Sequence, residues 1–218
     1  MIFKKFTFTL LLCLSGAFAQ EVKWMSIGDL HNWYSAAGSE IEVGRTGQVS
    51  DQQDGLRYPA FYRVQDNQAA KGLWLGASNF YDPVVNKDYD KKVVHAGPRH
   101  LDVENETMPV KMTMNGKYDH PNVFVDGDPA TNLQYLDYVD NVDPNLESDR
   151  KINNIVQTSL GVQMKRTIYA FSHPDHQNYH IQEYVFTNNG CFDKDCNISF
   201  EQNLEGFQVY LQYRYAIS

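Results

Sequence analysis

The stretch Val156–Ala170, which reads VQTSLGVQMKRTIYA, decides the fold class. Its apolar residues share one parity along the chain, and they are Val156, Leu160, Val162, Met164, Ile168 and Ala170. A period of two, with polar residues at the alternate positions, is typical of pleated strands that have one apolar face. Arg166 interrupts that face, and Gly161 predicts a bulge or a bend. The stretch therefore indicates β-structure.

Three further segments carry β-strand patterns. Two of them alternate between apolar and polar residues, at 110–115 and at 207–217, and the run Tyr179–Thr187 is rich in β-forming residues. Turn-forming residues separate the segments at short intervals, as in Asn115-Gly116 and Asp126-Gly127-Asp128-Pro129. Many short strands with such turns between them favour an all-β fold, and we predict an antiparallel β-sandwich whose strands lie in residues 91–218.

The N-terminal part of the mature chain, residues 20–90, shows a different pattern. Aromatic and apolar residues recur at helix-like spacing from Trp24 to Tyr34, although Gly28 and Gly38 weaken a helix there. Gln65–Lys71 is compatible with another helical turn, and Leu73-Trp74-Leu75 with a strand. We expect this part to be irregular, rich in aromatic residues and packed on a sheet edge.

Residues 1–19 have the sequence pattern of a secretory signal peptide. Lys4 and Lys5 precede the apolar run Phe6–Leu14, and small residues precede a cleavage site near Ala19. A buried N-terminal helix is the alternative, but the charged flank and the Ala-Phe-Ala ending favour the signal peptide. We therefore expect the protein to be secreted or displayed at the cell surface.

Composition excludes several classes of protein. Hydrophobic residues make up 42% of the chain, enough for a core, and the net charge of −8 becomes more negative when the leader lysines are removed. An acidic surface repels the phosphates of nucleic acids and of anionic membranes. No second apolar run of about 20 residues follows the leader, so we expect no membrane-spanning segment in the mature chain.

Two cysteines remain after the leader is removed, Cys191 and Cys196. An even number of cysteines in an oxidising compartment favours a disulfide. Their spacing is not that of a redox Cys-x-x-Cys motif, and two further zinc ligands do not lie nearby in the sequence. We therefore predict a disulfide that closes a short loop.

Two groups of residues are candidate metal ligands. His173, Asp175 and His176 are compactly spaced and suit zinc, but the intervening proline favours a solvated turn. Asp126, Asp128 and Asn132 alternate as oxygen ligands would for structural calcium, although Asp and Asn also form ordinary solvated turns. Both readings remain open for each group.

Aromatic residues offer a third kind of site. Trp24, Trp33, Trp74 and the 14 tyrosines could stack on the sugar rings of an extracellular glycan. Large aromatic side chains more often fill cores, and Trp74, between two leucines, is expected to be buried. We find no Gly-x-Ser-x-Gly motif and no His-Glu-x-x-His motif, so no catalytic residue is assigned.

Several short motifs resemble the N-terminal region of long secreted bacterial proteins of unknown function. They include Gln52–Pro59, Ala70–Gly76, Val93–Arg99, Val142–Leu146 and Tyr184–Gly190. The resemblance implies export, often with a C-terminal type IX secretion sorting domain, but it implies no catalytic residues. This sequence has no sorting domain and stops within the strand-like run Tyr213–Ser218, so we expect more protein to follow.

These observations favour a secreted or surface-displayed β-sandwich protein with a structural or binding role, in adhesion or in contact with an extracellular glycan or protein. The alternative is an accessory region of a secreted peptidase or glycosidase whose catalytic module lies downstream. No cofactor is expected, apart from the structural calcium considered above.

Overall fold

The computed structural model describes residues 21–40, 55–62, 67–96, 106–120, 124–129 and 137–215. The signal peptide expected at residues 1–19 lies outside this part of the chain, as does Asn132. The described residues form strands and connecting turns and contain no helix. The predicted all-β fold is thus confirmed.

The larger sheet has five strands in the order β11-β10-β9-β5-β8. Its members are β5 (Thr107–Gly116), β8 (Asn141–Val142), β9 (Arg150–Thr158), β10 (Val162–Ala170) and β11 (Ile181–Asn188). All neighbours are antiparallel except the short pairing of β5 with β8. The stretch Val156–Ala170 spans the hairpin from β9 to β10, and Gly161 (φ +70°) lies in its turn, so the predicted bend is a full chain reversal.

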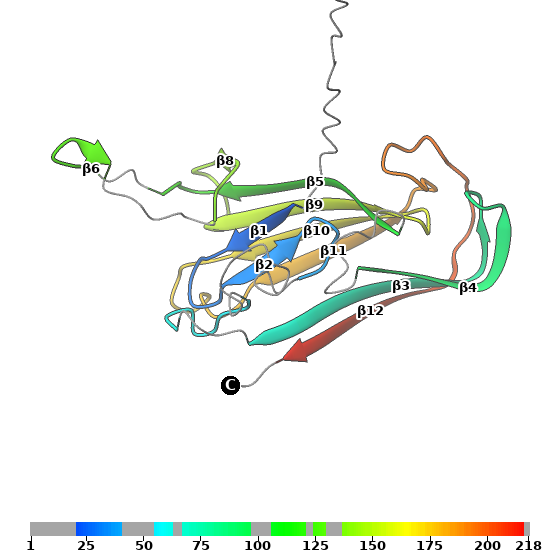
Figure 1. Cartoon of the computed structure of the whole chain (residues 1–218), viewed down its shortest axis with the longest axis horizontal. Coiled ribbons are helices and arrows are strands. Elements are labelled where there is room, and N and C mark those ends of the chain that lie inside the picture. The colour runs from blue at the N-terminus through cyan, green and yellow to red at the C-terminus, as the bar shows by residue number, and fades with distance from the viewer. Residues whose placement is uncertain are drawn as a thin grey trace, which may run out of the picture.

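The smaller sheet has three antiparallel strands in the order β12-β3-β4. They are β3 (Gln68–Asp82), β4 (Lys87–Ala96) and β12 (Glu205–Tyr215). β12 confirms the strand expected near the C-terminus of the chain. The described residues also form two small hairpins: β1 (Val22–Met25) with β2 (Asn32–Ser35), and β6 (Phe124–Val125) with β7 (Asp128–Pro129). Figure 1 shows the two larger sheets as separate layers, with the β6–β7 hairpin projecting at one end.

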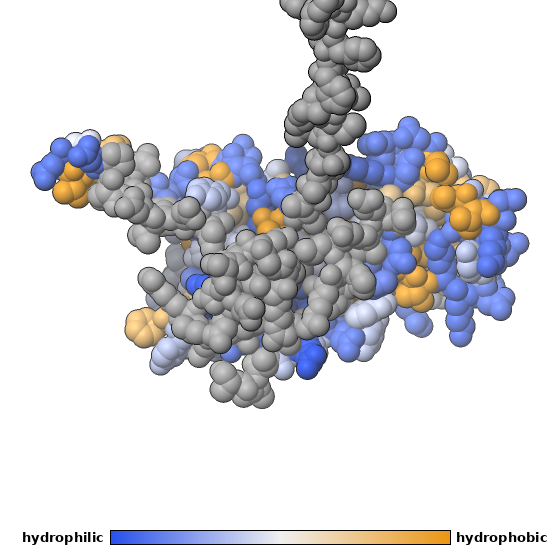
Figure 2. Space-filling view, in the orientation of Figure 1, coloured by the Kyte–Doolittle hydropathy of each residue, from blue (hydrophilic) through white to orange (hydrophobic). Residues whose placement is uncertain are grey.

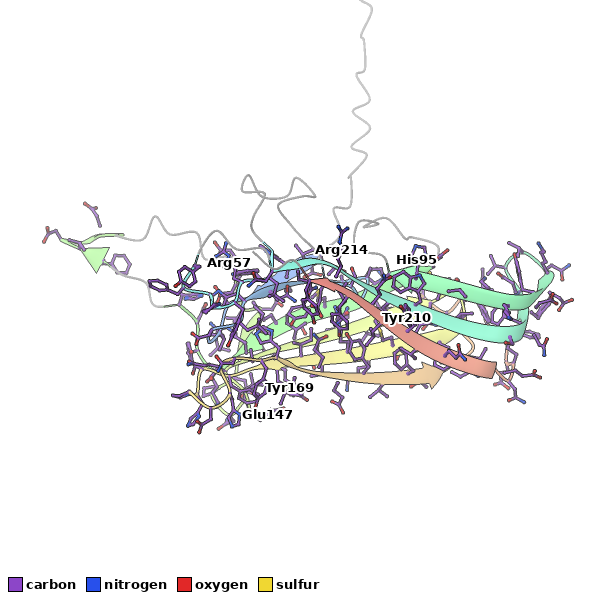
Figure 3. The ribbon with its side chains drawn as sticks, turned by 90° about the horizontal axis from the view of Figure 1, so that it is seen from below. Arg57, His95, Glu147, Tyr169, Tyr210 and Arg214 are labelled. Carbon is purple, nitrogen blue, oxygen red and sulfur yellow. A yellow bond between two sulfur atoms is a disulfide. The ribbon has the colours of Figure 1, made fainter. Side chains whose placement is uncertain are left out.

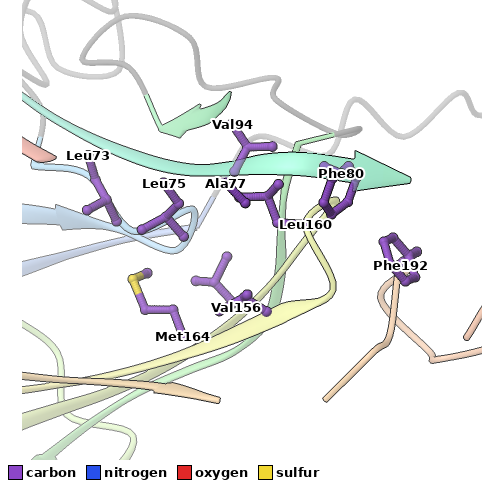
Figure 4. Packing of buried hydrophobic residues seen from close by; sticks show 10 residues of the cluster. Leu73, Leu75, Ala77, Phe80, Val94, Val156, Leu160, Met164 and Phe192 are labelled. Atoms are coloured by element: carbon purple, nitrogen blue, oxygen red, sulfur yellow. The ribbon is translucent and has the colours of Figure 1, made fainter. Parts of the chain in front are cut away.

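One face of the five-stranded sheet is covered by two elements. The three-stranded sheet covers part of it, and Leu73, Leu75 and Val94 contact Val156 and Met164 there (Figure 4). The β1–β2 hairpin covers another part of this face. Its buried apolar residues Met25, Ile27 and Tyr34 pack on Met112, Met114, Ile152 and Ile168 of the larger sheet. Two apolar layers that face each other in this way form a β-sandwich.

The structure corrects three expectations for residues 20–90. The helix-like spacing from Trp24 to Tyr34 belongs to the β1–β2 hairpin, and residues 68–71 begin β3 instead of forming a helical turn. The strand expected at Leu73-Trp74-Leu75 is confirmed as part of β3, and the expectation of irregular structure is wrong for the rest of β3 and for the start of β4. Cross-strand pairing overrides local spacing here, because tertiary contacts outweigh weak helix propensity.

Candidate functional site

Strand β3 presents two faces with opposite surroundings. Lys71, Leu73 and Leu75 point inward and are buried, whereas Trp74 and Gly76 point outward and are half-buried. Successive residues of a strand point to opposite faces, so the position of Trp74 between two leucines places it on the outer face. The expectation that Trp74 is buried is therefore wrong.

Trp74, His95 and Tyr210 form an aromatic group on the outer face of the three-stranded sheet, which we call the aromatic platform. Trp74 is the cross-strand partner of both His95 on β4 and Tyr210 on β12. The Trp74 and His95 rings are nearly parallel, at 12° with their centroids 6.3 Å apart, and the Tyr210 ring is 5.7 Å from that of Trp74. Tyr210 is 59% exposed, so the platform reaches solvent. Figure 3 shows His95 and Tyr210 on neighbouring parts of the sheet.

The orientation of Trp74 depends on Gly72. A Cβ atom at position 72 would lie 2.5 Å from two carbon atoms of the six-membered ring of Trp74. The indole therefore occupies the place that any side chain at position 72 would need. The indole lies along the strand because this neighbour is a glycine.

Glu106, the residue before β5, holds His95 in place. Its Oε2 atom accepts a hydrogen bond from the backbone N–H of His95 at 3.0 Å and lies 2.7 Å from the Nδ1 atom of the same residue. A carboxylate that contacts one ring nitrogen sets the orientation of the imidazole. The Glu106 side chain thus contacts both the backbone and the imidazole ring of His95 and holds the ring in its orientation.

Polar side chains of β12 surround the platform. Gln208 and Gln212 occupy the same face as Tyr210 at the positions before and after it, and Arg214 follows on that face. All three are exposed. An apolar ring surface with amide groups beside it can stack on a sugar ring and exchange hydrogen bonds with its hydroxyl groups.

The inner face of β3 contributes to a second group, Glu40, Lys71 and Arg166, which we call the charged cluster. Lys71 Nζ contacts Glu40 Oε1, and both side chains are about 2–3% exposed. Three amides also donate hydrogen bonds to the Glu40 carboxylate: Asn32 at 2.6 Å, Gln182 at 2.7 Å and Gln68 at 3.2 Å. A buried carboxylate with this many donors is held in its ionised form.

The pKa values of the pair follow from these contacts. Burial alone would raise the pKa of Glu40, but the charge of Lys71 and the hydrogen bonds from Lys71 and Gln182 outweigh it and lower the pKa. Burial would lower the pKa of Lys71, yet the charge of Glu40 raises it above its ordinary value. Both residues are therefore charged at neutral pH.

Arg166 ties the β1–β2 hairpin to the larger sheet. It donates hydrogen bonds to the carbonyls of Ser35 at 2.7 Å and Gly38 at 2.9 Å, and to Asn154 Oδ1 at 3.0 Å. Its guanidinium lies over the Tyr34 ring, with 5.6 Å to the centroid. The residue that interrupts the apolar pattern of β10 is thus a buried donor to backbone carbonyls.

Tyr34 and His180 lie beside the charged cluster. The Tyr34 hydroxyl is hydrogen-bonded to His180 Nδ1 at 2.8 Å. Burial lowers the pKa of His180 to about 4, although the charge of Glu40 acts in the opposite direction. Burial and the charge of Glu40 raise the pKa of the Tyr34 hydroxyl. Both side chains are neutral at pH 7. Because the charged side chains beside them are almost completely buried, we assign the charged cluster a structural role.

The predicted disulfide is confirmed. Cys191 and Cys196 are bonded with Cα atoms 4.8 Å apart, within the usual range for a disulfide. A hollow of about 420 Å³ lies beside it, lined by residues 188–190 and 201–203. Side-chain amides that line it donate hydrogen bonds to other residues of the protein. Asn188 donates to the Gln202 carbonyl at 2.8 Å, and Asn189 donates to Gln157 Oε1 at 3.0 Å. We therefore interpret the hollow as a junction between segments of the chain and assign it no binding role.

The candidate metal ligands lie on exposed turns. Asp126 and Asp128 belong to the β6–β7 hairpin, where Asp126 (φ +53°) and Gly127 (φ +88°) form the turn, and their expected companion Asn132 lies outside the described residues. His173, Asp175 and His176 are all exposed, and His176 bonds to the Tyr179 hydroxyl. Within the described ranges, no three His, Cys, Asp or Glu side chains are grouped as metal ligands would be. Metal binding by these residues stays a prediction.

Exposed apolar residues also occur at one end of the molecule, away from the groups described above. The turn between β3 and β4 exposes Val84 and Val85, and Figure 2 shows apolar residues among hydrophilic ones at that end of the molecule. Single exposed apolar residues are normal on a protein surface, so they mark no site.

The sequence named Trp74 and the tyrosines only as aromatic residues that could stack on a glycan, and it did not indicate which of them lie together. Tyr210 could be placed beside it only once β12 was known to pair with β3. Trp24 and Trp33 are buried, at 4% and 5% exposure, so they belong to the core. The charged cluster was missed, because 31 residues separate Glu40 from Lys71 and no local pattern joins them.

The described part of the chain holds no helix that is long and apolar enough to span a membrane. No family model, curated protein or solved structure matches the chain. The candidate functional site is therefore assigned from its geometry alone, and it is the aromatic platform.

Proposed function

We propose that this chain is a secreted or cell-surface β-sandwich protein that binds an extracellular glycan through the aromatic platform. One observation carries the proposal. Trp74, His95 and Tyr210 come from three different strands and gather on the outer face of a sheet, where they are not needed to fill the core.

The chemistry of the platform supports a neutral glycan as the ligand. The pyranose faces of sugars are apolar and stack on aromatic rings, while their hydroxyl groups take hydrogen bonds from amides such as those of Gln208 and Gln212. The net charge of −8 disfavours strongly anionic ligands. The signal-peptide pattern of residues 1–19 is consistent with a role outside the cell.

The test measures binding of the mature protein to an array of neutral polysaccharides. Affinity electrophoresis then measures the strength of binding to each polysaccharide that gives a signal. We expect Trp74→Ala to weaken binding at least tenfold, which corresponds to about 1.4 kcal/mol. Phe124→Ala is the matched control, because Phe124 is a 60% exposed aromatic residue on the distant β6–β7 hairpin. Equal binding by wild type and Trp74→Ala, or no binding to any glycan, would refute the proposal.

A further inference from the structure

The two edges of the three-stranded sheet differ in how they are protected. The β4 edge carries charges along most of its length, at Lys87, Asp88, Asp90, Lys91 and Lys92. β12 is 11 residues long and has charged residues only near its ends, Glu205 and Arg214. Charged side chains discourage another strand from pairing with an edge. The β12 edge lacks this protection along its centre.

β12 also leaves apolar side chains exposed on its inner face. Val209 and Leu211 are 42% and 37% exposed, whereas their cross-strand partners Leu75 and Leu73 are buried. Tyr213 on the same face is 42% exposed. Within the described residues, the order β12-β3-β4 leaves the other side of β12 without a strand. The apolar layer is therefore covered at β3 and open at β12.

An irregularity in β12 determines where its negative charge lies. Glu205 pairs with Ser78 and Gln208 pairs with Gly76, so β12 has one more residue than β3 in this interval. The extra residue is a β-bulge, and it puts Glu205 on the outer face together with Gln208 and Arg214. The outer face of β12 thus has a carboxylate at one end, where Glu205 Oε2 accepts a hydrogen bond from the Asn79 amide at 2.7 Å, and a guanidinium at the other.

We propose that two copies of this protein pair through β12 in an antiparallel arrangement centred on Tyr210, which joins two three-stranded sheets into a six-stranded sheet. A two-fold axis at Tyr210 sets Val209 opposite Leu211 of the second copy and Gln208 opposite Gln212. Because of the bulge, it also sets Glu205 opposite Arg214 of the second copy. Apolar, amide and charged residues then all meet suitable partners.

This self-complementarity favours a second copy over an unrelated strand. In a two-fold interface the same residues face each other twice, so a single strand must match its own reversed sequence. A shift of the register by two residues separates Glu205 from Arg214 and shortens the overlap. A shift by one residue sets apolar side chains against polar ones, since it moves them to opposite faces.

The dimer has a consequence for the platform, and this step rests on the proposed function. Trp74 and Tyr210 of both copies lie in one row across four adjacent strands, which spans about 14 Å at about 4.8 Å per strand. Such a row suits an extended polysaccharide that crosses the strands. Pairing of the copies does not itself depend on glycan binding.

The first test measures the molar mass of the mature protein by light scattering over a concentration series. We expect a dimer that dissociates on dilution, and we expect Val209→Lys to stay monomeric throughout, because it puts a charge on the inner face of the edge. Val185→Lys is the control, since Val185 is an exposed valine (46%) on the edge strand β11. Circular dichroism verifies that both variants fold. A wild-type monomer at every concentration, or a dimer unaffected by Val209→Lys, would overturn the inference.

The second test determines the register between the two β12 strands by cysteine cross-linking. Tyr210→Cys should form an intermolecular disulfide with itself, whereas Gln208→Cys alone should not, because the two copies of position 208 lie about 13 Å apart along the strands. A mixture of Gln208→Cys and Gln212→Cys should cross-link. Cross-linking of Gln208→Cys alone but not of Tyr210→Cys would overturn the register.

The two proposals fail separately. If Val209→Lys is monomeric and still binds short glycans, the dimer and the platform are both upheld. If the protein dimerises but binds no glycan, only the proposed function fails, and the pairing through β12 stands.

Discussion

The inner and outer faces of β3 each carry one residue that departs from the usual distribution. The inner face buries a lysine, Lys71, and the outer face presents a tryptophan, Trp74, to solvent. Each exception has a local cause. Glu40 and its amide donors surround the lysine, and Gly72 leaves room for the indole. The difference teaches that the partners available at a position decide burial here, and hydrophobicity alone does not.

The two exceptions also differ in what they do for the fold. Desolvation of a buried ion pair offsets much of its attraction, so the charged cluster adds less stability than apolar residues of the same volume could. Its members come from distant parts of the chain, which favours a role in specifying one arrangement of the two sheets and the β1–β2 hairpin. The platform, in contrast, lies on the outer face of the sheet, and its residues are not part of the buried core.

The largest expected effect comes from breaking the charged cluster. Lys71→Met leaves the Glu40 carboxylate buried without its cation, and we expect a loss of about 3–5 kcal/mol in the free energy of unfolding, measured by urea denaturation. The double variant Glu40→Gln/Lys71→Met should recover much of this loss. Lys91→Met, on an exposed position of β4, should change stability by less than about 0.5 kcal/mol. A single variant as stable as wild type would contradict the structural role of the pair.

We expect mild acidification to lower the free energy of unfolding through His180, at pH values above those at which the carboxylates become protonated. The pKa of His180 is about 4 in the folded protein and 6.5 ordinarily, so below pH 6.5 the unfolded chain binds a proton that the folded protein does not. The free energy of unfolding therefore falls as the pH drops from 6.5 toward 4, by up to about 3 kcal/mol. Urea unfolding at several pH values would measure this slope. His180→Gln should flatten it between pH 6.5 and 5, and an unchanged slope would show that another group titrates.

Loss of the disulfide should have a smaller effect. It closes a short loop, so its removal costs about 2 kcal/mol by the loop-entropy estimate. The measurement compares the melting of wild type with that of the variant Cys191→Ser/Cys196→Ser. Reducing agent should destabilise the wild type by the same amount and leave the variant unchanged. A response of the variant to reductant would point to a different cause.

The smallest effect on stability is expected at the platform. Trp74→Ala removes a half-buried side chain from the outer face and should cost about 1 kcal/mol, within the range of ordinary point substitutions. Leu73→Ala, one position earlier on the buried face, should cost about 2–5 kcal/mol. Thermal melting of both variants gives the comparison directly. Equal losses would mean that the two faces of β3 are packed alike.

The strands were largely predictable because their alternation is a local signal. The run Val156–Ala170 predicted its own apolar face, and Gly161 predicted a bulge or a bend where the structure has the turn of a hairpin. Near the N-terminus, the spacing from Trp24 to Tyr34 fits both a helix and a hairpin with a long turn, and only the packing on Met112 and Ile168 decides between them.

The partners of residues in the aromatic platform and in the charged cluster could not be predicted from local patterns, because they lie far away in the chain. Trp74 was noticed, but the side on which it lies follows from the parity of a strand that begins at Gln68, a residue expected in a helical turn. Arg166 was seen as an interruption, and its function as a donor depends on carbonyls at Ser35 and Gly38. Contacts across more than a hundred residues leave no trace in neighbouring positions.

The bonds of Arg166 also constrain the order of folding. Gly38 and Arg166 lie 128 residues apart, so the β1–β2 hairpin cannot settle onto its support until β9 and β10 have been synthesised. Non-local pairing of this kind slows folding, since a long loop must close before the contact forms. β1 and β2 are therefore synthesised before the other strands described but are among the last to pack onto the larger sheet.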